Sequence, residues 1–389
     1  MLTSQKHLFQ LPDDVTYLNC AYLSPQLRSV ETAGFQAVSH KNLPFMVQPV
    51  DFFTEVIKLK SLFANIINAS DPTRIAIIPS ASYGIATVAK NVKLRAGDNI
   101  MVAEDQFPSN IYSWQRLTQE ANAELRVVAA PIATNRTEAW NEAILHAIDE
   151  RTRMVAIANA HWADGTRFDL MAIRQKTREV GALLVIDGTQ SVGALPIDVK
   201  LLQPDALICA SYKWLFGPYS TALAYYGSYF DNGIPIEENW INRLNSEDFR
   251  GLVKYEPAYQ PGAGRYSVGE QSNFVLVPML IAALEQIIAW KVINIQTYCK
   301  NISRKPLEIL QELGCKVEDE TTRCGHLFGT RLDDALFDFQ ALSQAFAEHQ
   351  VYVSVRGTSI RVAPHVYNDE RDFDRLIQCF EKARRKVYY

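Results

Sequence analysis

The sequence has few cysteines, little net charge and no long hydrophobic run, and each of these shortages excludes a class of protein. Six cysteines lie scattered among 389 residues without a Cys-x-x-Cys pair, which excludes a zinc ribbon, a thioredoxin-like redox site and a disulfide framework. With 39 basic against 43 acidic residues the net charge is −4, so we expect no nucleic-acid partner. The most apolar stretch, 274–290, contains Glu285 and is shorter than a membrane span, so we expect a buried helix there and no membrane association.

Several catalytic and nucleotide-binding motifs are also missing. The only Gly-x-Gly, at Gly262 and Gly264, is followed by Ser267 where a dinucleotide-binding fingerprint has its third glycine. No phosphate-binding P-loop, zinc-binding His-Glu-x-x-His or Gly-x-Ser-x-Gly elbow occurs, and we expect no metal site. Residues 1–15 contain no apolar run, so we expect no signal peptide and a cytoplasmic protein.

Between residues 74 and 227, short apolar runs alternate with amphipathic segments. The runs are expected to form strands at 74–80, 100–105, 124–130, 154–160, 182–187, 205–211 and 221–227. The segments between them are expected to form helices at 83–92, 110–121, 139–148 and 170–180. Strands that are apolar throughout are typical of a mostly parallel sheet with helices on both faces, so we predict an α/β fold.

After residue 290 the strict alternation stops. Helices are expected at 297–313, 338–350 and 370–386, strands at 315–320 and 326–333, and a β-hairpin from 351–357 and 359–365. This pattern predicts a smaller α+β domain in the C-terminal part of the chain.

Polar residues stand where three elements of the predicted sheet end. Asp187 closes one apolar run, Lys213 follows the next, and Ser80, Ala81 and Ser82 lie between a strand and a helix. Ligands of open α/β sheets bind outside the carboxyl ends of the strands. A lysine among aromatic residues is a candidate nucleophile because desolvation lowers its pKa. A helix N-terminus with hydroxyl groups is suited to a phosphate. An amine nucleophile, a buried carboxylate and a phosphate site are together what pyridoxal phosphate (PLP) requires.

The segment 160–217, with Asp-Gly-Thr-Gln at 187–190 and Ser-Tyr-Lys at 211–213, resembles the class V aminotransferase family of fold-type-I PLP enzymes. Cysteine desulfurases, selenocysteine lyases, kynureninase and isopenicillin N epimerase belong to that family. The similarity extends from 17–25 to 359–368. It implies a large domain at 20–270 with a mostly parallel seven-stranded sheet, a small domain from 1–19 and 271–389, and a homodimer with shared active sites.

The resemblance implies a role for each cofactor-binding residue. Lys213 matches the lysine that forms the Schiff base, and Asp187 matches the partner of the pyridine nitrogen. Gln190 matches the residue that hydrogen-bonds the phenolic oxygen of the cofactor. The hydroxyl of Tyr212 and the N-terminal groups of Ala81 and Ser82 match the phosphate site. Phe107 matches the residue stacked on the ring, where desulfurases have a histidine.

On the substrate side, Arg361 matches the arginine that binds the substrate carboxylate with its two-pronged guanidinium. Arg356 is a second candidate for this role. Asn19 and Tyr22 lie in a segment that borders the substrate pocket in relatives.

Three departures from the family pattern stand out. Trp162 replaces an asparagine near the ring oxygen. Gly269-Glu270 replaces a Gly-Thr whose hydroxyl reaches the phosphate of the partner subunit, and Ser272 is the candidate substitute. The stretch 356–361 is shorter than the loop that carries the catalytic cysteine in desulfurases, and no cysteine lies between Cys324 and Cys379.

We therefore predict a PLP-dependent transferase or lyase that acts on an amino acid through an external aldimine, by transamination, elimination or epimerisation. From the short loop and Phe107 we also predict that it is not a persulfide-forming cysteine desulfurase. Two alternatives remain open. One is a catalytically silent binding or regulatory protein. The other is a cysteine desulfurase or selenocysteine lyase that uses an unrecognised thiol, with Cys20 as the first candidate.

Overall fold

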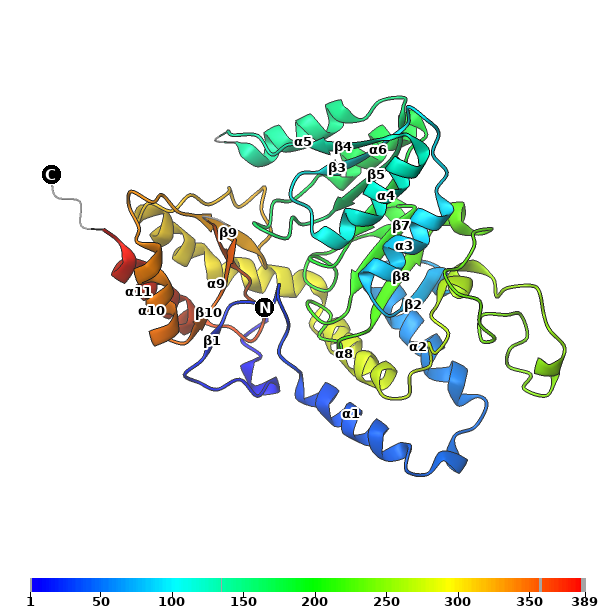
Figure 1. The fold of residues 1–389 in the computed structure, drawn as a ribbon. Helices are drawn as coiled ribbons and strands as arrows, with labels where there is room; N and C mark the ends of the chain where they lie inside the picture. The colour runs from blue at the N-terminus through cyan, green and yellow to red at the C-terminus, as the bar shows by residue number, and fades with distance from the viewer. Residues whose placement is uncertain (1, 134, 357–358, 386–389) are drawn as a thin grey trace.

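A seven-stranded sheet forms the centre of the protein, for which a computed structural model describes residues 2–133, 135–356 and 359–385 (Figure 1). Its strand order is β2-β8-β7-β6-β5-β3-β4. The strands are β2 (Ile75–Ile78), β3 (Asn99–Ala103), β4 (Glu124–Val128), β5 (Thr152–Ala158), β6 (Leu183–Asp187), β7 (Ala206–Ala210) and β8 (Ala222–Tyr226). Only β8 runs antiparallel to its neighbours, β2 and β7. This confirms the predicted mostly parallel α/β sheet.

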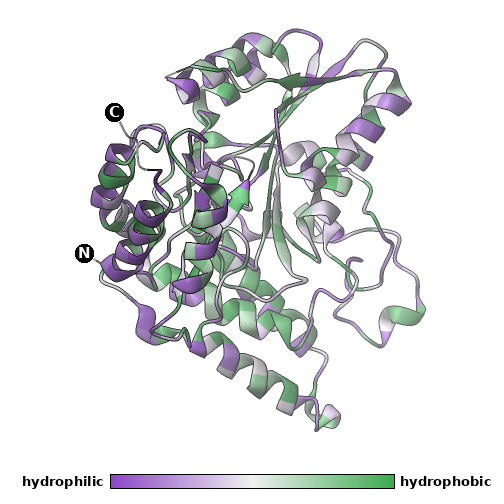
Figure 2. Ribbon diagram, turned by 60° about the vertical axis from the view of Figure 1, so that its left-hand side comes forward, coloured by the Kyte–Doolittle hydropathy of each residue, from purple (hydrophilic) through white to green (hydrophobic). Residues whose placement is uncertain are grey.

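The strands are apolar throughout because both faces of the sheet are buried. In β3, Ile100 and Val102 belong to one hydrophobic cluster, whereas Met101 and Ala103 belong to another. Successive side chains of a strand point to opposite faces, so each face has its own core. Figure 2 shows the hydrophobic colours of the sheet between helices with hydrophilic outer sides.

Helices cover both faces of this sheet. Those that precede or lie between its strands are α1 (Arg28–His40), α2 (Asp51–Ile66), α3 (Ala81–Asn91), α4 (Tyr112–Ala121), α5 (Arg136–Ala147), α6 (Leu170–Val180) and α7 (Val199–Leu202). The short 3-10 helices are η1 (Lys6–Leu8), η2 (Pro44–Met46), η3 (Pro72–Arg74), η4 (Pro108–Asn110), η5 (Ser228–Phe230), η6 (Gly251–Val253) and η7 (Gly262–Tyr266). Helix α8 (Leu276–Trp290) packs against α1 and α2, and seven of its 15 residues are buried.

A separate hydrophobic core gathers the C-terminal elements. They are α9 (Val292–Glu312), β9 (Phe328–Arg331), α10 (Phe339–Glu348), β10 (Val351–Tyr352), β11 (Ser354–Arg356), β12 (Ser359–Val362) and α11 (Glu370–Ala383). Strands β11, β12 and β9 form an antiparallel sheet. The division into domains at residue 270 stays a prediction.

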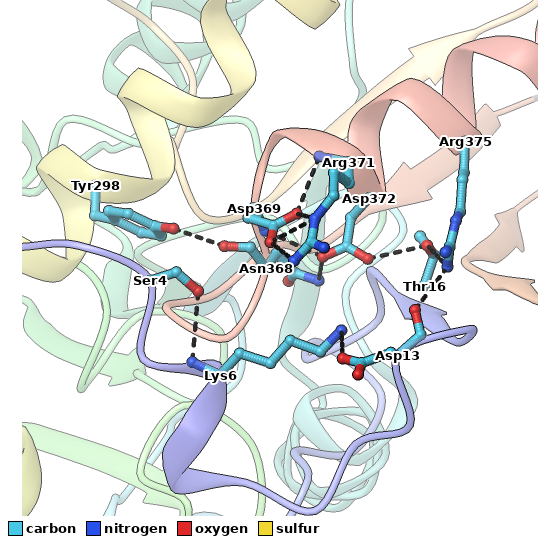
Figure 3. Close-up of polar contacts among 10 residues, drawn as sticks. All are labelled: Ser4, Lys6, Asp13, Thr16, Tyr298, Asn368, Asp369, Arg371, Asp372 and Arg375. Carbon is cyan, nitrogen blue, oxygen red and sulfur yellow. Dashed lines mark hydrogen bonds and ion pairs between the residues drawn. The ribbon is translucent and has the colours of Figure 1, made fainter.

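The N-terminal segment is bound to this C-terminal part (Figures 1 and 3). Strand β1 (Thr16–Tyr17) pairs in parallel with β10. The Thr16 hydroxyl donates to Asp372 at 2.9 Å, and Asn368 donates to the same carboxylate at 3.0 Å. The following residues contact the chain just after β6 and β7, because the Ala21 carbonyl accepts from Gln190 and the Ser24 amide donates to the Tyr212 carbonyl.

Some local expectations differ from the structure. The range 315–320 is not a strand, because only Lys316 pairs with Arg331 before Asp319 caps a turn at Thr321. Helices α1 and α2 were not assigned from the sequence. Gly357 and Thr358 of the predicted hairpin turn lie outside the described residues. Across the described chain no single helix has the length and apolarity of a membrane span. Helices α8 and α9, which meet at a 70° bend, have that length and apolarity only when taken together.

Candidate functional site

A cavity of about 340 Å³ lies at the carboxyl ends of the sheet strands. Its lining residues come from the ends of β3, β5, β6 and β7, from the N-terminus of α3 and from the segment before β8. Eight of the predicted site residues line it: Ala81, Ser82, Phe107, Trp162, Asp187, Gln190, Tyr212 and Lys213. The sheet therefore assembles in one place residues that are far apart in the sequence.

Lys213 lies on the turn that follows β7, with only 6% of its surface exposed. Its Nζ atom is 5.5 Å from the ring centre of Phe107 and 5.6 Å from that of Tyr212. The pKa of Lys213 is lowered to about 8, mainly by burial; the carboxylate of Asp187 opposes the shift and the positive charge of Arg361 adds to it. Near pH 8 about half of this amine is therefore neutral, and the neutral form is the nucleophile.

Asp187 ends β6 and contributes its carboxylate to the cavity. Burial raises its pKa, and hydrogen bonds from Thr189 oppose the rise. The Thr189 amide donates to its Oδ1 atom at 3.0 Å. A partly buried carboxylate with so few donors is suited to a cationic ligand group.

The N-terminus of α3 also lines the cavity. Ser80 caps the helix, because its hydroxyl accepts from the Tyr83 amide at 3.2 Å. This leaves the amides of Ala81 and Ser82 without an acceptor among the described residues. Free amides at a helix N-terminus form an anion site. Tyr212 also lines the cavity, with its ring 4.6 Å from that of Tyr219.

Two aromatic rings form a further side of the cavity. Phe107 and Trp162 meet edge to face with 5.6 Å between ring centres. The Trp162 indole donates to the Asp105 carbonyl at 2.6 Å, so its N–H is already occupied. Trp162 therefore supplies a surface and not the hydrogen bond that an asparagine would supply there.

The predicted substrate-binding residues lie outside the lining of this cavity. Arg361, only 1% exposed, donates to the Trp162 carbonyl at 2.9 Å and to the Ser354 hydroxyl at 3.1 Å. The same hydroxyl donates to Asn19 at 2.8 Å. Burial, together with the nearby charge of Arg356, lowers the pKa of Arg361 to about 10. The guanidinium of Arg356 lies 5.2 Å from the Trp162 ring centre, and that of Arg361 lies 5.9 Å from it.

Two predicted residues stand apart from this group. Tyr22 is 63% exposed. Ser272 and Glu270 line a different hollow of about 660 Å³, together with Trp240 and Phe274. A contribution of Ser272 to the phosphate site of a partner subunit stays a prediction.

Sequence reasoning missed several residues that line the cavity: Gln106, Ser109, Thr189, Tyr219, Ser220 and Thr221. Gln106 follows β3, and its amide donates to the Ala156 carbonyl at 2.8 Å. Its place after an apolar strand is the same signal that identified Asp187. Tyr219 and Thr221 carry no comparable signal in the sequence. They reach the cavity only because the loop between Lys213 and β8 folds back toward it.

All six cysteines are buried as free thiols. Two of them lie near the site: the sulfur of Cys20 is 3.9 Å from the Lys213 carbonyl, and Cys209 is on β7, which leads to Lys213. Burial raises the pKa of Cys20 and of Cys209 well above the usual range. Within the described ranges no group of three or more His, Cys, Asp or Glu residues is arranged to hold a metal ion.

The residues of the cavity fit PLP. The amine of Lys213 has no carboxylate within ion-pair distance among the described side chains, and the amides of Ala81 and Ser82 lack acceptors. The amine is suited to an aldehyde, the Asp187 carboxylate to a ring cation and the two amides to a phosphate, and PLP carries all three groups.

Comparison with known proteins supports this assignment. The family model "Aminotransferase class-V" matches residues 47–233. A cysteine desulfurase of Escherichia coli is 28% identical over 375 residues, which are 90% of this chain and 87% of that protein. An uncharacterised protein of Schizosaccharomyces pombe is 24% identical over 94% of this chain and 83% of its own.

Solved structures share the fold. The cysteine desulfurase CsdA of E. coli superimposes with a TM-score of 0.80 at 18% identity, covering 97% of this chain and 96% of its own. A variant of C-DES with glycine linked to its PLP cofactor gives 0.87 at 19% identity, covering 98% and 100%. A complex of the cystine C–S lyase C-DES with its reaction product, cysteine persulfide, gives 0.84 at 19% identity, covering 95% and 98%.

These relatives overturn one prediction. The inference from the short 356–361 stretch and Phe107, that the chain is not a persulfide-forming desulfurase, is wrong, because relatives along most of its length are cysteine desulfurases. The missing cysteine shows only that no thiol is present in that loop. It does not determine which bond of the substrate is cleaved. The chain thus shares the fold of fold-type-I PLP enzymes, and over residues 47–233 its sequence is similar to the class V aminotransferase family.

Proposed function

We propose that the protein is a PLP-dependent carbon–sulfur lyase that acts on L-cysteine or its disulfide L-cystine and leaves the sulfur in a persulfide. The observation that carries this proposal is the Lys213–Asp187 cavity in a chain 28% identical, over 90% of its length, to a cysteine desulfurase. The substrate named for C-DES is of the same chemical class.

Four residues of the cavity then have defined tasks. PLP, when bound, withdraws electrons from the substrate carbon that loses its proton. Lys213, with a pKa lowered to about 8, exchanges a proton at that carbon near neutral pH. Asp187 keeps a positive charge on the ring nitrogen, while the amides of Ala81 and Ser82 hold the phosphate.

Arg361 is assigned to the substrate carboxylate. It has no acidic partner among the described residues, and its hydrogen bonds to Trp162 and Ser354 hold it in place. Asn19 acts through Ser354, so it positions Arg361 without touching the substrate. A guanidinium held in this way can bind a carboxylate with two parallel hydrogen bonds.

The fate of the sulfur depends on the substrate. With cystine, the bond between the β-carbon and sulfur breaks, and the sulfur leaves with the electron pair as cysteine persulfide. Water converts the remaining three carbons to pyruvate and ammonia, and no oxidant is needed. With cysteine, a protein thiol takes the sulfur and alanine remains. Cys20 lies beside Lys213, but it must first become exposed.

We further propose that the protein acts in the cytoplasm as a homodimer. Seven apolar side chains on the segment from α1 to α2 are exposed in the single chain: Phe35, Val38, Leu43, Phe45, Met46, Val50 and Ile57. An apolar surface of this kind is suited to burial against a second copy. Sedimentation of the purified protein at micromolar concentration tests the dimer.

The experiment for the function is a product assay on the PLP-loaded protein with alanine, aspartate, serine, cysteine and cystine. We expect persulfide with alanine or pyruvate from the sulfur amino acids, and no comparable turnover of the others. Transamination of alanine or aspartate without persulfide from cysteine or cystine would contradict the proposal.

A further inference from the structure

Gln190 is the only predicted cofactor residue whose side-chain orientation is dictated on both sides by buried protein groups. Its Oε1 atom accepts from the Trp214 indole at 2.9 Å. Its Nε2 atom donates to the Ala21 carbonyl at 3.1 Å. Both Gln190 and Trp214 are buried, with 5% and 0% of their surfaces exposed.

The chemistry of the two partners leaves one arrangement. An indole N–H only donates and a carbonyl oxygen only accepts. Turning the amide over would set an N–H against the indole N–H and an oxygen against the Ala21 oxygen. Leaving such buried groups unpaired is costly. The oxygen of Gln190 therefore faces Trp214, and its nitrogen faces Ala21.

The backbone of Gln190 is held independently. The Nδ1 atom of His326 lies 2.8 Å from the amide nitrogen of Gln296, which can only donate. The Nε2 atom of His326 therefore carries the proton and donates to the Gln190 carbonyl at 2.8 Å. Burial lowers the pKa of His326 to about 4, so this histidine is neutral at physiological pH. His326 thus places the residue, and Trp214 orients its side chain.

One N–H of the Gln190 amide remains without an acceptor among the described residues, and the residue lines the cavity. We propose that Trp214 is a positioning residue for the cofactor: its indole N–H orients the Gln190 amide so that a donor, and not the amide oxygen, is presented to the phenolic oxygen of PLP. Trp214 itself is absent from the cavity lining, so it acts only through Gln190. The proposal rests on the cofactor and not on the proposed substrate.

The test is a pH titration of the visible absorption band of the PLP-loaded protein without substrate. A hydrogen bond to the phenolic oxygen stabilises its negative charge and therefore favours the proton-poor form of the lysine-linked cofactor. Removing Gln190 by Gln190→Ala should raise the titration midpoint by about 0.5–1 pH unit. Trp214→Phe, which keeps an aromatic ring but removes the N–H, should raise it in the same direction by at least half as much.

Two further variants separate positioning from packing. In the Gln190→Ala background, Trp214→Phe should add no further shift, because its target is gone. Trp290→Phe is the matched control, since Trp290 is also buried and donates to a glutamine oxygen, that of Gln5, at 3.3 Å outside the cavity. It should leave the midpoint unchanged.

An unchanged midpoint in Trp214→Phe would overturn the proposal, as would an equal shift in the Gln190→Ala background or in Trp290→Phe. If Trp214→Phe does not fold, Trp214→Met replaces it, because a flexible apolar side chain fills the space without a donor. A borohydride-reducible band in each variant shows that the cofactor is linked, so the result does not depend on turnover of any substrate.

Discussion

The two sides of the site are built differently. The cofactor side rests on the ends of parallel strands, and its residues enclose one cavity. On the substrate side, Arg356 and Arg361 come from the small antiparallel sheet, and Asn19 comes from the N-terminal segment. Neither arginine lines the cavity. The ends of one sheet bring most of the cofactor side together, with Gln190 held in addition by Ala21 and His326. The substrate side instead depends on separate segments of the chain meeting outside the large sheet.

The largest effect should come from breaking the cofactor side at Lys213. We expect Lys213→Ala to lose the borohydride-reducible band and to reduce turnover at least about 1,000-fold, because nucleophile and proton carrier are lost together. Lys60→Ala is the matched control. Lys60 lies on α2 outside the cavity, and burial lowers its pKa to about 8 as well. A reducible band retained in Lys213→Ala would assign the linkage to another lysine.

Asp187→Asn keeps the shape of the carboxylate and removes its charge. Turnover should fall about 100-fold while PLP remains bound, because the neutral amide no longer stabilises a cationic ring nitrogen. Absorbance of the bound cofactor and steady-state rates measure the two quantities separately. Asp169→Asn, at the cap of α6, is the control and should change neither. Normal turnover in Asp187→Asn would show that Asp187 does not act on the cofactor.

The substrate side should respond in KM. Arg361→Lys keeps the charge but loses the two-pronged guanidinium, so KM for the sulfur amino acid should rise about 10- to 150-fold. Arg356→Lys should raise it less, since Arg356 is the more exposed residue and makes its side-chain hydrogen bond to the neighbouring Val355 carbonyl. If the two effects are reversed, the roles of the two arginines are exchanged.

A smaller effect links the two sides through charge. Because the pKa of Lys213 is lowered to about 8, the rate at which apo-protein captures PLP should rise with pH up to about 8 and then level off. Arg361 contributes to this lowering, so Arg361→Gln should move the plateau to higher pH. Stopped-flow absorbance measures it. A rate that climbs steadily toward pH 10 in the unmodified protein would contradict the lowered pKa.

The same division explains what the sequence predicted. Asp187 and Lys213 were found because apolar strands with polar ends have a recognisable pattern, and parallel strands bring those ends together. The hydrogen bonds of Arg361 to Trp162 and Ser354 were not predictable, because they depend on how separate segments pack. The fate of the sulfur was predicted wrongly, since the reasoning used the absence of one loop cysteine and could not see how the buried thiols lie.

The most direct test of the account is one incubation of the PLP-loaded protein with ³⁴S-labelled L-cystine or L-cysteine, followed by mass spectrometry of the protein and of the small molecules. We predict labelled persulfide, in solution from cystine or on a protein thiol from cysteine, with matching pyruvate or alanine, and none of these products with Lys213→Ala. Intact labelled substrates after incubation with a protein that carries reducible PLP on Lys213 would contradict it.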